Sequence, residues 1–99
     1  MMINNKNQST DLYEAIATLS TAEEVQALLI DICTPQELAA LSQRFAVAKM
    51  LWEGKYYSEI IEATGASSAT VSRVKRSIYN GSGYELVFGA PSEDAPSGT

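Results

Sequence analysis

The side chains between Tyr57 and Arg76 are mainly small, polar or basic, which are the types that contact DNA. Arginine can form two hydrogen bonds to a guanine edge, and serine or threonine can bond to bases or phosphates. Short side chains let the end of a helix come close to base edges. With the preceding lysine included, the candidate DNA-binding residues are Lys55, Ser67, Ser68, Ala69, Thr70, Ser72, Arg73 and Arg76.

These residues fall within the pattern of a helix-turn-helix. Gly65 lies where a first helix must end in a sharp turn, since glycine adopts left-handed backbone angles without steric cost. Ser67 or Ser68 is a suitable N-cap for the second helix. One apolar stripe of that helix has helical spacing and should be buried: Val71, Val74 and Ile78. The alternative is a helical hairpin whose polar face is only solvated.

The sequence gives little support for a catalytic site or a metal site. The chain has no histidine, which is the commonest general base and metal ligand, and Cys33 is its only cysteine. Cys33 lies in an apolar stretch and is best interpreted as a small core residue. No paired-cysteine motif, phosphate-binding glycine loop or nucleophile elbow is present. The sequence predicts a protein that is not an enzyme and binds no metal.

Hydropathy and cysteine content indicate the cellular compartment, and the distribution of charge indicates the kind of binding partner. No apolar run approaches the roughly 20 residues of a membrane span, and the N-terminus lacks the apolar core of a signal peptide. A single cysteine fits a reducing compartment, so we expect a cytoplasmic protein. The net charge is −5, yet residues 55–79 carry four basic and two acidic side chains. Positive charge is thus concentrated in the predicted motif, although it is modest for binding phosphates.

Three earlier segments have the start signals of helices. The first follows Ser9-Thr10, the second follows a capping box over 21–24, and the third begins at 34–35 and runs to about Trp52. Their apolar surface exceeds what a small DNA-binding unit needs, which favours a subunit interface over a large monomeric core.

The predicted fold is all-α, with five or six short helices and the helix-turn-helix near the C-terminus. Residues 84–88 fit a strand-like arm, a short helix or a covering tail. The predicted domain spans residues 10–88, between a disordered N-terminus (1–9) and a disordered acidic tail rich in Ser, Pro and Gly (89–99).

Over about residues 11–88 the chain resembles the tryptophan repressor superfamily, in particular its branch of YerC/YecD-like regulators. Three segments carry the resemblance: Thr34-Pro35-Gln36-Glu37, Leu41-Ser42-Gln43-Arg44 and Thr64-Gly65-Ala66-Ser67-Ser68-Ala69-Thr70-Val71-Ser72-Arg73. The resemblance implies an intertwined homodimer that binds double-stranded DNA. It also implies that four residues match those contacting tryptophan in the repressor: Thr34, Arg44, Arg73 and Ser77.

One departure from the family pattern argues against a tryptophan-like corepressor. Val74 stands where the repressor has a glycine that leaves room for the indole ring, and overfilling a packed site costs about 1–3 kcal/mol. Each matched residue also has an ordinary role, such as a helix cap at Thr34. The leading hypothesis is therefore an ungated, sequence-specific DNA-binding repressor. The alternatives are a repressor gated by tryptophan or an indole compound, and a protein-interaction module that does not bind DNA.

Overall fold

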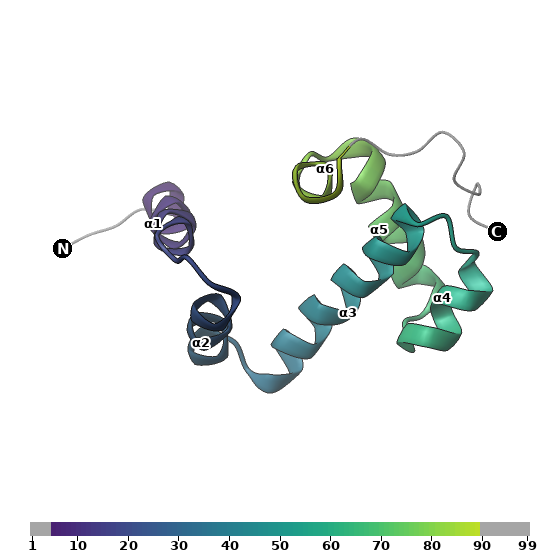
Figure 1. The fold of residues 1–99 in the computed structure, drawn as a ribbon, viewed down its shortest axis with the longest axis horizontal. Helices are drawn as coiled ribbons and strands as arrows, with labels where there is room; N and C mark the ends of the chain where they lie inside the picture. The colour runs from purple at the N-terminus through teal and green to yellow at the C-terminus, as the bar shows by residue number, and fades with distance from the viewer. Residues whose placement is uncertain (1–4, 90–99) are drawn as a thin grey trace. The chain divides into compact units, whose positions relative to one another are not determined.

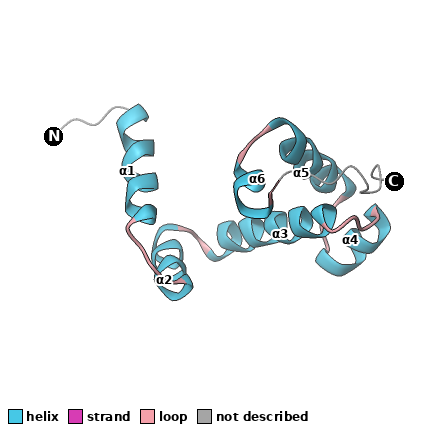
Figure 2. Ribbon diagram, turned by 45° about the horizontal axis from the view of Figure 1, so that its top comes forward, coloured by secondary structure: helices cyan, strands magenta, loops and turns pink. Residues whose placement is uncertain are grey.

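The computed structural model describes residues 5–89, and every regular element within them is an α-helix (Figures 1 and 2). The helices are α1 (Asn5–Ala17), α2 (Ala22–Ile32), α3 (Pro35–Trp52), α4 (Tyr57–Thr64), α5 (Ser68–Asn80) and α6 (Gly83–Phe88). This confirms the predicted all-α class. The chain divides into two compact parts, one up to Leu38 and one from Ala39 onward. No described helix is long and apolar enough to cross a membrane.

The starts of α2 and α3 confirm two predicted capping signals. At Thr21 the hydroxyl accepts the Glu24 N–H at 3.1 Å, and the Glu24 carboxylate accepts the Thr21 N–H at 3.2 Å. The same reciprocal pair joins Thr34 and Glu37, at 3.1 and 2.8 Å. Each box satisfies two backbone donors that a helix start would otherwise leave unpaired.

The first helix begins earlier than predicted. α1 starts at Asn5, so Ser9 and Thr10 lie inside it and do not form its cap. Lysine and glutamine are good helix formers and can continue a helix through Lys6 and Gln8. The helix therefore includes residues 5–9, although these residues are predicted to belong to a disordered N-terminus. The rest of the predicted disorder, at 1–4 and 90–99, lies outside the described residues, and the domain boundaries stay predictions.

The core of the second part joins α3, α4 and α5. It confirms the predicted buried stripe of α5, since Val71, Val74 and Ile78 are at most 6% exposed. These side chains pack with four other buried residues: Val47, Ala48, Ile60 and Ala66. Burying one aliphatic side chain of this size contributes about 1.5–3 kcal/mol to stability. The polar face of α5 consequently points away from the core.

An aromatic cluster attaches α6 to α3. The Phe88 ring stacks on Trp52 at 6.0 Å between centroids and lies tilted against Phe45 at 5.3 Å. The Tyr84 ring lies 6.4 Å from Phe45. Tyr84 and Phe88 are one helical turn apart and therefore share a face. Of the three conformations considered for residues 84–88, the structure has the short helix, and the strand-like arm is excluded.

Much apolar surface remains outside the core of the described chain. α2 has no buried residue, although its sequence is largely apolar. Ile30 and Ile32 are each 53% exposed, and Leu41 and Phe45 of α3 are each 43% exposed. The apolar surface of α3 is thus only partly buried by the described chain itself.

Candidate nucleic-acid interface

The turn between α4 and α5 has the backbone that the sequence predicts. Gly65 has a φ of 74°, in the left-handed region, and its N–H donates to the Ile61 carbonyl at 2.9 Å. The Thr64 hydroxyl accepts the N–H of Ala66 at 3.1 Å. Ala66 is 2% exposed, so its methyl group anchors the turn in the core. The start of α5 is thereby held at a defined position beside α4.

Ser67 is the N-cap of α5. Its hydroxyl accepts the Thr70 N–H at 3.1 Å and donates to the Thr70 hydroxyl at 3.1 Å. This resolves the choice between Ser67 and Ser68, and it gives Ser67 and Thr70 a structural task. Both remain candidate DNA-contacting residues, but each would have to rearrange a cap to offer its hydroxyl to DNA.

Five predicted residues form one exposed strip along α5, which we call the recognition face: Ser68, Ala69, Ser72, Arg73 and Arg76. They recur at helical spacing on the side opposite the buried stripe. The strip presents two guanidinium groups and two hydroxyls, and it has only short side chains at the N-terminal end of the helix. Its composition suits a groove in which base edges offer hydrogen-bond acceptors and donors.

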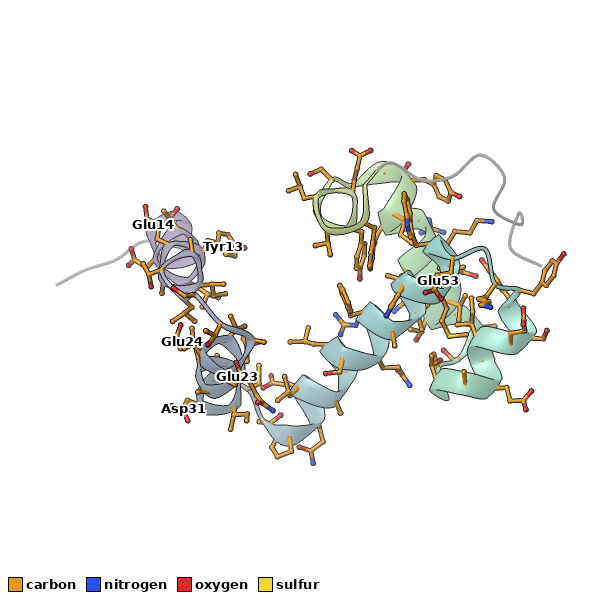
Figure 3. All side chains as sticks on the ribbon, in the orientation of Figure 1. Tyr13, Glu14, Glu23, Glu24, Asp31 and Glu53 are labelled. Carbon is orange, nitrogen blue, oxygen red and sulfur yellow. The ribbon has the colours of Figure 1, made fainter. Side chains whose placement is uncertain are left out.

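The segment that contains the recognition face, residues 55–79, carries four basic and two acidic side chains. Exposed Lys55 precedes α4, and the Lys75 ammonium lies 5.9 Å from the centroid of the Tyr57 ring, a cation–π arrangement. No acidic residue occurs between Glu62 and Glu85. By contrast, the exposed carboxylates labelled on α1 and α2 in Figure 3 include Glu14, Glu23, Glu24 and Asp31.

A hollow of about 570 Å³ lies between α3, α5 and α6. Three of the four residues that the resemblance matched to a tryptophan site line it, namely Arg44, Arg73 and Ser77. Thr34 belongs to the other part of the chain, where its hydroxyl caps α3. Val74 is 3% exposed and also lines the hollow, so its side chain narrows this space without closing it.

Three further residues line the hollow without having been assigned a role from the sequence: Ala40, Gln43 and Tyr84. Gln43 precedes the matched Arg44, but nothing in the pattern assigned it a role. Tyr84 reaches the hollow because α6 packs against α3, an arrangement that the ambiguous conformation of residues 84–88 concealed. Within residues 5–89, no group of three or more potential metal-ligating side chains could hold an ion.

The family model of the Trp repressor protein matches residues 7–88, which is most of the chain. The chain belongs to this family. Trp repressor family members are regulators, so the chain is a regulatory protein and not an enzyme. The family match also confirms the resemblance inferred from the three sequence segments.

Three relatives agree with this assignment. YerC of Bacillus subtilis, an uncharacterized protein, is 44% identical over 78 residues, covering 78% of this chain and 75% of YerC. A candidate Trp repressor from Staphylococcus aureus has a crystal structure with a TM-score of 0.75, 43% identity and 81% coverage of both chains. A TrpR-like protein from Eubacterium eligens has a TM-score of 0.76 and 48% identity, covering 86% of this chain and 92% of that one.

The left-handed turn gives a stability prediction. Gly65→Ala should lower the free energy of unfolding by about 1–2 kcal/mol, because an L side chain is strained at positive φ. The added methyl group itself would meet only the Gln43 side chain, at 4.0 Å. Gly83→Ala is the matched control, because Gly83 lacks a positive φ and a methyl group there would have nothing within 4 Å. Urea unfolding measures both variants, and equal stabilities would contradict the strain argument.

Proposed function

We propose that this chain is a sequence-specific transcriptional repressor of the cytoplasm that binds double-stranded DNA as a homodimer, through α4 and α5. The observation that carries the proposal is the recognition face of α5, in a chain of the Trp repressor family. In a helix-turn-helix, the second helix enters the major groove and its N-terminal residues contact base edges. Ser68, Ser72, Arg73 and Arg76 are the side chains available for those contacts.

The modest positive charge favours two copies on one DNA site. The motif segment 55–79 contributes four basic and two acidic residues in a chain of net charge −5. Affinity for the phosphate backbone grows with the number of phosphates neutralised, so one copy has a weak electrostatic contribution. Two copies double it, and two half-sites about 34 Å apart match a two-fold dimer.

The apolar surface of the first three helices supports the same assembly. α2 has 11 residues and buries none of them, whereas a helix this short is marginal unless one face is packed. The large exposed apolar side chains of α1–α3 are Leu12, Tyr13, Ile30, Ile32, Leu41 and Phe45. A second copy offers the same surface in return, as a two-fold interface requires.

The proposed repressor needs no corepressor, but the hollow supports a ligand-gated form as a second candidate. Arg44 and Arg73 line it from facing helices, and a pair of guanidinium groups suits a carboxylate. Val74 opposes this candidate, because it takes up space where a flat ring would lie. The ungated form is therefore the first proposal, and ligand titration separates the two.

The recognition face predicts the effect of two substitutions on DNA affinity. Arg73→Ala and Arg76→Ala should each weaken binding by about 1–3 kcal/mol if the arginine contacts a base, and should leave folding intact. Lys49→Ala is the control, since Lys49 is an exposed cation on α3 outside the face. Fluorescence anisotropy at fixed salt, with a duplex selected from genomic fragments, measures the affinity.

Two results would count against this assignment. If both arginine variants bind the selected duplex as tightly as the parent protein, the recognition face is wrong. If the parent protein binds no duplex with an affinity that falls as salt rises, the chain is a protein-interaction module.

The proposed dimer predicts a change in association state. Ile30→Glu should weaken self-association at least tenfold, about 1.4 kcal/mol, because it places a carboxylate in an apolar interface. Gln26→Glu adds the same charge at an exposed polar position of α2 and should leave association unchanged. Sedimentation equilibrium measures both. A monomeric parent protein, or a dimeric Ile30→Glu variant, would refute this interface.

Calorimetry tests the second candidate. Tryptophan should produce no saturable heat with the purified protein, and it should leave DNA affinity unchanged. Saturable micromolar binding would replace the ungated proposal with the gated one. In that case Arg44→Ala should abolish the heat, since Arg44 lines the hollow, whereas Lys49→Ala should not.

A further inference from the structure

We propose that Gln43 is a positioning residue that holds the turn of the helix-turn-helix on α3, so that α5 is oriented for DNA without a bound ligand. The inference rests on the proposed function and adds a residue to it that does not contact DNA. Its basis is one hydrogen bond between Gln43 and Thr64, which lie 21 positions apart in the sequence. A further hydrogen bond of Thr64 connects it to the turn.

The hydrogen bond joins α3 directly to the end of α4. The Gln43 side-chain amide donates from Nε2 to the Thr64 carbonyl at 3.1 Å, in a partly buried position. Thr64 is the last residue of α4, and the final carbonyls of a helix have no partner within it. Gln43 therefore satisfies an acceptor that would otherwise be left to solvent at this partly buried site.

Thr64 passes this constraint to the turn. Its hydroxyl donates to the Ile60 carbonyl at 2.7 Å and accepts the Ala66 N–H at 3.1 Å. One residue thus connects α3, the last turn of α4 and the backbone that leads into α5. Gln43 Nε2 also lies 4.0 Å from where a Cβ atom on Gly65 would stand, so the amide borders the left-handed residue itself.

The core contacts between α3 and the motif are of a different kind. Val47 and Ala48 pack in the apolar core with residues of α4 and α5. Apolar burial is strong but has no direction, whereas a hydrogen bond prefers a narrow range of distances and angles. The hydrogen bond from Gln43 therefore restricts how the turn lies on α3. Because it is part of the chain, the tie needs no second molecule to set the angle of α5.

The test compares Gln43→Met with the parent protein. Methionine has a similar length and no amide donor, so the variant loses the tie while filling similar space. Gln36→Met is the matched control, since Gln36 is exposed on the same helix. Affinity is measured by anisotropy for a duplex selected by the parent protein and for a random duplex, and hydrogen exchange is followed at the Gly65 and Ala66 amides.

Gln43→Met should bind the selected duplex about three- to tenfold more weakly, as expected for the loss of one net hydrogen bond. Binding to the random duplex should change little, because it depends mainly on charge. A purely structural defect would lower both affinities together. The Gly65 and Ala66 amides should exchange faster than in the parent protein, and Gln36→Met should match the parent in every measurement.

Four results would overturn the inference. Unchanged exchange at Gly65 and Ala66 would show that Gln43 does not hold the turn. A parallel loss of selected and random binding, or no loss of either, would show that it does not orient α5. If the parent protein binds no duplex, the proposed function fails and the inference fails with it. Faster exchange in the variant would then show that the tie exists but serves another purpose.

Discussion

The rest of the second part of the structure depends on the shared burial of three helices. Val47 and Ala48 of α3, Ile60 of α4 and Val71 of α5 are fully buried. Because α5 contributes three residues to this core, its opposite side must face solvent. The recognition face is therefore a direct result of packing, and any loss of the core would remove the face as well.

Polar contacts restrict the orientation of α5, which apolar burial in the core leaves undetermined. Gly65 allows the sharp turn, the Ser67 hydroxyl caps α5, and Thr64 connects the turn to both α4 and α3. Each of these bonds contributes only about 0.5–1.5 kcal/mol, much less than the core as a whole. Their value lies in direction, since they determine where α5 starts and how it lies on α3. Stability and orientation thus come from different residues.

Sequence alone predicted the features that depend on local chemistry. Capping boxes, the left-handed glycine and the buried stripe of α5 each follow from neighbouring residues, and all were found at the expected positions. The predicted start of α1 was wrong, because residues with favourable helix propensity extend the helix to the N-terminal side of Ser9-Thr10, its predicted cap. Gln43 and Tyr84 were missed because their roles depend on packing between distant segments, which no local pattern records. The association state and the DNA contacts stay predictions for the same reason.

The hydroxyl pair at the N-cap of α5 has a consequence for how much sequence one copy could distinguish. Ser67 and Thr70 bond to each other. In the proposed complex, Ser68, Ser72 and two arginines are then the side chains that can bond to bases without rearranging this cap. So few side chains specify only a short run of base pairs, and short runs recur many times in a genome. Competing DNA sites elsewhere in the genome would then limit regulation more than the affinity for the target site does. A longer DNA site made of two half-sites would occur less often in a genome, and it would need no further DNA-contacting residues in α5.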